Sequence, residues 1–169
     1  MLGLRVADTR VSGIWRMADG PTDIQIRVAA ALSIGIASDS RGVAAARIYD
    51  AVAEAIGERH GPRPATAKQV EFAQSLGLEV RGDTVRVVSA KIADELGRRN
   101  REALDTLRLQ PGDRVMTRKV YEIDGQRHEL IREFTVSSID ARGRVHFKGG
   151  NGDSAWATEL ERVAVEERG

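Results

Sequence analysis

The chain has 169 residues, which is enough for one ordinary domain or two small ones. Its 26 basic and 25 acidic residues leave a net charge of +1, which excludes a histone-like polycation, so any nucleic-acid contact must come from local patches. The absence of cysteine excludes disulfides and thiolate metal ligands. No apolar run approaches the roughly 20 residues of a membrane span, and arginines interrupt the apolar N-terminal stretch. We therefore expect a cytoplasmic protein without a signal peptide or membrane contact.

The first 20 residues repeat part of a motif that returns later in the chain. The pattern Leu-Gly-Leu-x-Val occurs at residues 2–6 and at residues 76–80, and Asp-Thr follows it in both places. This similarity predicts a half unit at residues 1–20, with the second helix of a repeat but not the first. A half unit must pack on a neighbouring unit or on another subunit, so the sequence also predicts self-association as a homodimer.

A self-match at an offset of 44 residues predicts two copies of a helical unit, at residues 21–60 and 64–109. The identical pairs are Thr22 with Thr66, Gln25 with Gln69, Ala29 with Ala73, Leu32 with Leu76, Asp39 with Asp83, Val43 with Val87, Ala46 with Ala90, Ile48 with Ile92 and Asp50 with Asp94. In the middle of the unit, Ile-Gly-Ile at residues 34–36 lies two residues late relative to Leu-Gly-Leu at residues 76–78. We interpret this difference as a loop shortened by two residues.

Each copy carries the signals of two short helices. Thr-x-x-Gln at residues 22–25 and again at 66–69 matches a capping box, so both glutamines are interpreted as structural. Gly35 or Gly77 can end the first helix in a left-handed cap. The pairs Asp39-Ser40 and Asp83-Thr84 predict the N-caps of the second helices. A further helical stretch at residues 100–107 belongs to the second copy, and the sequence leaves open whether it continues from the second helix through Gly97.

The pattern changes at Gln-Pro-Gly-Asp, residues 110–113, and predicts a β domain over residues 111–167. Asp124-Gly125 lies between two strand-like runs and predicts a hairpin turn. Side chains alternate over residues 144–148, with Val145 and Phe147 on one face and basic residues on the other. Five short strands in about 55 residues are typical of a small barrel. The predicted fold is therefore α+β: duplicated helical hairpin units followed by a five-stranded small β-barrel.

Two segments resemble known families. The stretch from Leu76-Gly77-Leu78 through Gly82 to Leu96 resembles the SAP and LEM type of helix–loop–helix module, which implies binding of DNA or DNA-associated proteins near the loop. It departs from such modules at the acidic Asp83, which Arg81, Arg86 and Lys91 partly offset. The tail, with Gly-Asp-Arg-Val at 112–115, Gly-Arg-Val at 143–145, Trp156 and Leu160, looks like a Tudor- or KOW-like barrel, which implies binding of nucleic acid or peptides.

Two sets of basic residues are candidate phosphate contacts. In the β domain they are Arg118, Lys119, Arg144, His146 and Lys148. In the helical part they are Arg81, Arg86, Lys91, Arg98 and Arg101. Ordinary solvated surfaces are the alternative for both sets, since acidic residues are interleaved with the helical ones. Trp156 and Phe147 are predicted to be barrel core.

No catalytic motif and no metal-binding motif stands out. The three histidines lie in separate elements, the Gly-rich run at residues 149–152 lacks the Lys-Ser/Thr of a phosphate-binding loop, and no serine has the setting of a nucleophile elbow. We therefore expect no enzymatic activity and no cofactor. The leading hypothesis is a nucleic-acid-binding accessory protein that contacts the phosphates of DNA or RNA within a larger nucleoprotein assembly. The alternative is a protein-interaction module, either an adaptor or a phage- or plasmid-type inhibitor of a host enzyme.

Overall fold

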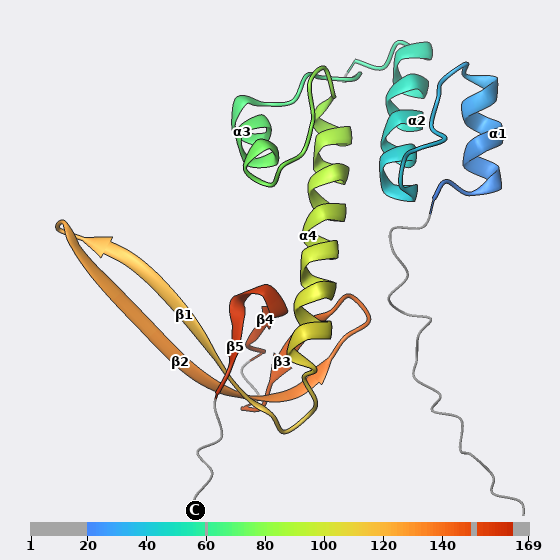
Figure 1. Cartoon of the computed structure of the whole chain (residues 1–169). Coiled ribbons are helices and arrows are strands. Elements are labelled where there is room, and N and C mark those ends of the chain that lie inside the picture. Colours follow the sequence, from blue (N-terminus) through green and yellow to red (C-terminus); the bar gives the residue numbers. More distant parts are fainter. Residues whose placement is uncertain (1–19, 60, 150–151, 164–169) are drawn as a thin grey trace, which may run out of the picture. The chain divides into compact units, whose positions relative to one another are not determined.

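The computed structural model describes residues 20–59, 61–149 and 152–163. The chain forms two compact units that divide between Leu96 and Gly97, which we call the helical unit and the β unit (Figure 1). Four helices precede a five-stranded antiparallel sheet, so the α+β class is confirmed. No helix in the described ranges is long and apolar enough to cross a membrane. The predicted half unit at residues 1–20 lies outside the described residues, apart from Gly20.

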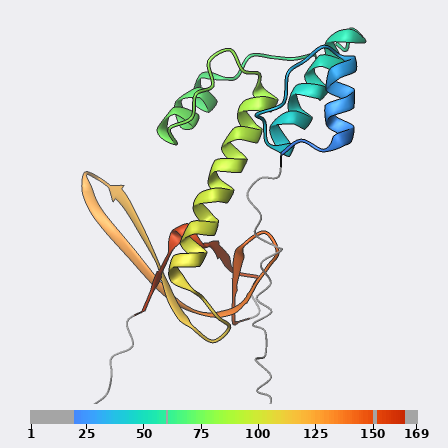
Figure 2. The same ribbon diagram turned by 45° about the vertical axis from the view of Figure 1, so that its right-hand side comes forward.

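The two predicted copies both fold into a pair of helices. The helices are α1 (Asp23–Ala31), α2 (Arg41–Ala55), α3 (Ala67–Ser75) and α4 (Val85–Leu107). Both capping boxes are present, with the side chains of Thr22 and Thr66 each accepting a bond from the backbone of the glutamine three residues on. Ser40 and Thr84 cap α2 and α4 through Val43 and Val87. Figures 1 and 2 show α1 lying beside α2, and α3 beside the first turns of α4.

The predicted two-residue shift between the copies is wrong, because the offset of 44 holds throughout. Ser33, with φ of 56°, occupies the left-handed position that Gly77 fills with φ of 82°. The bond that follows is the same in both copies: the amide of residue 34 donates to the carbonyl of Ala29 over 3.0 Å, and that of residue 78 donates to Ala73 over 3.0 Å. Gly35 is therefore not the left-handed cap. The chain tolerates serine there because a single left-handed residue costs only about 1–2 kcal/mol.

The two cores match position by position. In the first copy, Ala29, Ile36 and Ala44 form a buried cluster with Ile34 and Ile48 packed against it. In the second copy the residues 44 positions later, among them Ala73, Val80 and Val88, form the equivalent cluster. An alanine in α1 and in α3 lets each short helix approach its partner closely, since Ala29 is 2% and Ala73 0% exposed.

The copies contact each other through reciprocal carboxylate bonds. The hydroxyl of Thr84 donates to Asp50, and the hydroxyl of Ser40 donates to Asp94. Each carboxylate thus reaches the N-cap of the other copy's second helix, as expected for two similar modules related by an approximate two-fold axis. The arrangement is uneven at one point, because Arg86 also binds Asp50 over 2.8 Å, whereas Gly42 stands at the equivalent position beside Asp94.

The stretch at residues 100–107 is the C-terminal part of α4, which runs without a break through Gly97.

The strands of the β unit are β1 (Arg114–Ile123), β2 (Gln126–Ile139), β3 (Arg144–Phe147), β4 (Ser154–Trp156) and β5 (Leu160–Arg162). Their order is β4-β3-β2-β1-β5, so β4 and β5 are the two edges and the predicted barrel is wrong. The sheet is open, since its three-residue edge strands β4 and β5 each pair with a single neighbour and not with each other.

The end of α4 packs on the sheet in the β unit. Leu104 and Leu107 contact a core that includes Val115, Val136 and Val145, each fully buried. Asn100 is 4% exposed and satisfies two backbone groups, donating to the carbonyl of Gly143 over 2.9 Å and accepting from Ala157 over 2.7 Å. A buried amide with both partners in place ties the helix to two loops of the sheet.

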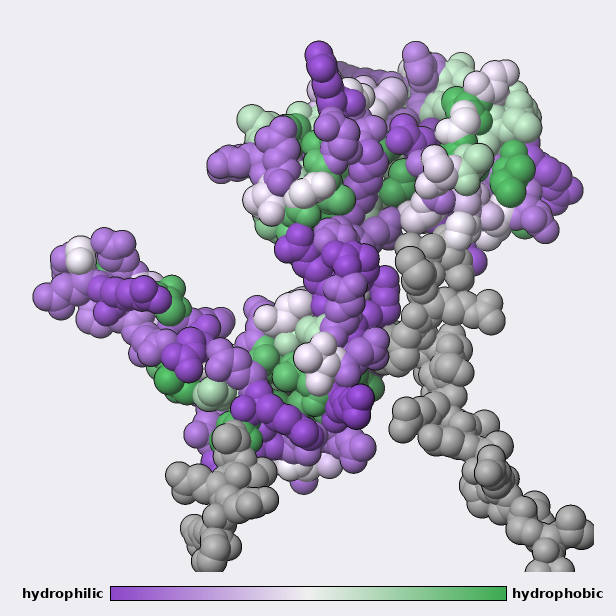
Figure 3. All heavy atoms as spheres, viewed as in Figure 1, coloured by the Kyte–Doolittle hydropathy of each residue, from purple (hydrophilic) through white to green (hydrophobic). Residues whose placement is uncertain are grey.

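The hairpin of β1 and β2 is confirmed, with Asp124 and Gly125 at φ of 52° and 74°, as a type I′ turn requires. It extends beyond the rest of the sheet (Figures 1 and 2), because β5 pairs only with residues 115–117 and β3 only with residues 136–139. We call residues 118–131 the arm. Figure 3 shows apolar side chains exposed on the arm between hydrophilic ones.

Candidate functional site

Three of the five predicted basic residues in the helices are held by carboxylates. Arg86 binds Asp50, and this hydrogen bond raises the pKa of Arg86 above its ordinary value. Lys91 binds Asp83 over 2.6 Å, and Arg98 binds Glu102 one turn along α4. The exposed pair of Arg98 with Glu102 is typical of an ordinary solvated helix surface, whereas the side chains of Asp50 and Asp83 are only 9% and 10% exposed.

The two other helical candidates lie in separate units. Arg81 is exposed in the loop before α4, where it lines a hollow with Pro64 and Val80. Arg101 is half-buried on α4 within the β unit, and its guanidinium lies 3.3 Å from the point where a side chain on Gly97 would begin. Within the helical unit, no row of unpaired basic side chains is formed by the described residues of this set.

The β-unit candidates fall into two groups. His146 lies 3.4 Å from Asp140, whose pKa is lowered mainly by a bond from the backbone of Arg144. Lys148 lies just beyond the end of β3 and is exposed. Of the predicted row of Arg144, His146 and Lys148, only Arg144 lines the pocket described next.

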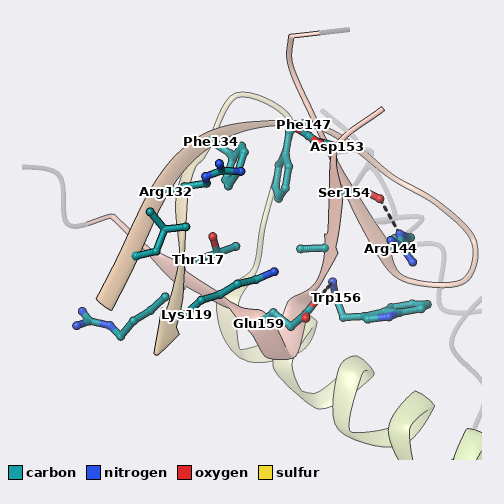
Figure 4. A pocket seen from close by; sticks show the side chains of 13 residues that line it. Thr117, Lys119, Arg132, Phe134, Arg144, Phe147, Asp153, Ser154, Trp156 and Glu159 are labelled. Atoms are coloured by element: carbon teal, nitrogen blue, oxygen red, sulfur yellow. Dashed lines mark hydrogen bonds between the residues drawn. The ribbon is translucent and has the colours of Figure 1, made fainter. Parts of the chain in front are cut away.

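Arg118, Lys119 and Arg144 are brought together at a pocket of about 600 Å³ on the sheet (Figure 4). The pocket is lined by Thr117, Arg118, Lys119, Leu130, Arg132, Phe134, Arg144, Phe147, Asp153, Ser154, Ala155, Trp156 and Glu159. In Figure 4, Lys119 from β1, Arg132 from β2 and Phe147 from β3 reach into the same cavity. Basic residues from three strands, Lys119 of β1, Arg132 of β2 and Arg144 of β3, thus line one concave surface.

Aromatic side chains share this pocket. The rings of Phe134 and Phe147 stack with centroids 4.2 Å apart and planes 13° apart. Trp156 is 38% exposed, so its predicted place in the core is wrong, whereas Phe147 both contacts the core and lines the pocket. The guanidinium of Arg144 lies 5.3 Å from the centre of the Trp156 ring and is held by Ser154 over 2.7 Å. This cation–π contact fixes the orientation of an exposed indole.

The pocket has an excess of positive charge. Four basic residues line it against two acidic ones, Asp153 and Glu159. The carboxylate of Glu159 accepts a bond from the backbone of Trp156 over 2.9 Å, and the carboxylate of Glu129, outside the pocket, binds Arg118 over 2.6 Å. Among the residues with described placement, no carboxylate lies within 4.0 Å of the cationic groups of Lys119, Arg132 or Arg144. These three cations are therefore available to an anionic ligand.

Arg132 is not among the basic residues that the sequence analysis selects, although the hairpin register places it beside Lys119. The turn at Asp124-Gly125 fixes the pairing of the hairpin, in which Thr117 lies opposite Arg132 and Lys119 opposite Leu130. Residues that lie directly opposite each other share a face, and faces alternate along a strand. Counting outward from the turn would have placed Arg132 on the same face as Lys119.

The pocket combines basic and aromatic side chains. No group of three or more His, Asp or Glu side chains that could hold a metal ion occurs in the described part of the chain. Comparison of the chain with family models, with curated proteins and with solved structures finds no match.

Proposed function

We propose that the chain is a non-catalytic binding protein for single-stranded nucleic acid, DNA or RNA, and that the pocket on the β unit is its binding site. The observation that carries the proposal is the convergence of Lys119, Arg132 and Arg144, none with a carboxylate partner among the described residues, beside the exposed ring of Trp156. Such a protein would act as an accessory component of a nucleoprotein assembly.

Positive charge and exposed aromatic rings are the two elements of single-strand recognition. Lysine and arginine attract the phosphates, and unpaired bases stack on aromatic side chains whatever their sequence. In a duplex the faces of the bases are already stacked on one another and cannot reach Trp156. The combination in this pocket therefore favours a single strand over a duplex.

The helical unit contributes less to this proposal. Its cations at Arg47, Arg86 and Lys91 all bind carboxylates, which compete with phosphate for the same donors. The β unit is thus the part of the chain whose charge best suits a polyanion.

A fluorescence-anisotropy titration of the full chain against labelled oligonucleotides tests the proposal. With about 15 nucleotides of single-stranded DNA or RNA we expect micromolar binding or tighter, and weaker binding to duplex. If the three unpaired cations each neutralise one phosphate, the logarithm of the affinity should fall with the logarithm of salt concentration with a slope of about 2. Binding that is absent at low salt, or indifferent to salt, would disprove the proposal.

A second candidate function is docking of a protein partner on the helical unit. Tyr49 and Val52 of α2 and Ile56, the residue that caps its C-terminus, follow one another at three and four residues and are 51%, 38% and 71% exposed. Side chains at this spacing share one face of a helix, and exposed apolar stripes are typical of interaction sites. A partner captured by the wild-type chain after nuclease treatment, and lost with Ile56→Glu, would support this second function.

A further inference from the structure

The arm carries two faces of different character. Opposite residues in the hairpin pair share a face, and here Lys119 lies opposite Leu130, and Tyr121 opposite His128. We call this side the pocket face; its members on the arm are Lys119, Tyr121, Ile123, Gln126, His128 and Leu130. No acidic residue stands on it. The other face carries Arg118, Val120, Glu122, Arg127, Glu129 and Ile131.

The charges on the other face are balanced, and Arg118 is bound by carboxylates. Arg118 binds Glu129 over 2.6 Å and also lies 3.4 Å from Glu161 of β5. The hydrogen bond to Glu129 raises the pKa of Arg118 above its ordinary value. A polyanion is therefore attracted to the pocket face and not to its reverse.

The pocket face leads directly out of the binding pocket. Lys119 and Leu130 line the pocket and also begin the arm, and Arg132 stands one step nearer the sheet on the same side. From residue 118 to residue 123 the strand extends for about 17 Å at roughly 3.4 Å per residue. A chain held in the pocket can therefore continue along the arm without crossing an acidic side chain of the hairpin.

Beyond Lys119 the pocket face offers a second aromatic platform. The rings of Tyr121 and His128 stack across the two strands, with centroids 6.3 Å apart and planes 19° apart. Tyr121 is 43% exposed, and neither outer edge of the arm is covered by another described strand. The charges along both strands oppose pairing of the arm with a second copy of itself, as charged edge strands generally do.

We infer that a single-stranded nucleic acid leaves the pocket along the pocket face of the arm, with a base stacked on Tyr121 and His128. This inference rests on the proposed function of the pocket and specifies how far the binding site extends. The binding site is then longer than the pocket, and oligonucleotides that fill only the pocket miss the arm.

Two oligonucleotide lengths and two matched variants of the full chain test the arm. Tyr121→Ala removes the platform, and Val120→Ala, the neighbouring residue with 46% exposure, truncates the opposite face. We expect Tyr121→Ala to weaken binding of a single strand of about 15 nucleotides by about 5- to 150-fold, the usual effect of losing one stacking residue, and to leave one of about 4 nucleotides unchanged. Val120→Ala should change neither.

The outcomes separate the arm from the pocket. If Tyr121→Ala equals Val120→Ala on the long strand while Trp156→Ala weakens both lengths, the arm inference is overturned and the pocket function stands. If Tyr121→Ala weakens binding of duplex as much as that of the single strand, the proposed path is also overturned. If the wild-type chain binds neither length, the proposed function fails and the inference fails with it. Matching thermal unfolding of all three variants excludes misfolding, since the three mutated side chains are exposed.

Discussion

The basic residues around the contact between the two helical copies and those on the pocket face of the hairpin differ in their partners. In the helical unit, Arg47 binds Asp39 over 2.9 Å, Arg86 binds Asp50, and Lys91 binds Asp83. In the β unit, one face of a hairpin holds Lys119 and Arg132 with no acidic residue on that face. Although the chain has nearly equal numbers of basic and acidic residues, the two kinds are thus separated locally on this hairpin.

The total number of charges is therefore a poor guide to ligand binding, whereas the ion pairs that each basic residue forms are informative. A cation bound to a carboxylate of its own chain contributes to structure, because a phosphate would have to displace that carboxylate. A cation without such a partner is available for a ligand. The ion pairs of the helical unit therefore contribute to the contact between the two copies, and the cations on the pocket face mark the place where we propose that an anion binds.

The largest expected effect comes from reversing the unpaired charges. Lys119→Glu with Arg132→Glu should weaken binding of a long single strand on the order of 100-fold at low salt, since two attractions become repulsions. Anisotropy titration measures the loss.

The control for this pair is Arg114→Glu with Arg127→Glu, which changes the net charge equally on the opposite face of the same hairpin. It should alter affinity by only a few-fold through the overall field. Equal losses in both double variants would show that total charge, rather than the pocket face, governs binding.

A second test concerns the pairing within the helical unit. Asp50→Ala should lower the free energy of unfolding by about 1.5–3 kcal/mol, since the 7% exposed carboxylate bonds to both Thr84 and Arg86. Asp94→Ala should cost less, about 0.5–1.5 kcal/mol, because Ser40 bonds to it and Gly42 supplies no cation. Urea unfolding of both variants measures the difference, and nucleic-acid binding should be unaffected. Equal costs would mean that Arg86 adds nothing to the interface.

The sequence predicted what local rules decide. The capping boxes, the N-caps at Ser40 and Thr84, the cap at Gly77 and the turn at Asp124-Gly125 each depend on a few neighbouring residues, and all are confirmed. The continuity of α4 through Gly97 could not be predicted because a single glycine costs about 1 kcal/mol in a helix, which tertiary packing can outweigh.

The errors arose where distant parts of the chain decide the structure. Sheet closure depends on whether the first and last strands meet, which short strands such as Ser154–Trp156 do not reveal by themselves. Trp156 was expected in the core because apolar rings are usually buried, yet the open sheet leaves its ring at the pocket. The shift assumed at residues 34–36 came from matching letters rather than positions, since Ser33 can take the conformation of Gly77.

The smallest expected effect concerns Asp140 in the β unit, whose carboxylate accepts bonds within its own turn. Asp140 accepts bonds from the backbone of Arg142 over 2.8 Å and of Arg144 over 3.0 Å, and these bonds, with the bond to His146, keep its pKa below the ordinary 3.8. A carboxyl whose pKa is depressed in the folded state adds stability above its unfolded pKa and loses it as the pH falls through its folded value. Asp140→Asn should therefore destabilise the chain slightly at pH 7, and the difference from wild type should disappear in acid, below the ordinary carboxyl pKa. Urea midpoints measured across that range check the sign.

Because Asp140 and His146 do not line the pocket, single-strand affinity at neutral pH should stay at the wild-type value. A loss of affinity in this variant would place the Asp140 turn in the binding site and would extend the site beyond the face that holds the unpaired cations.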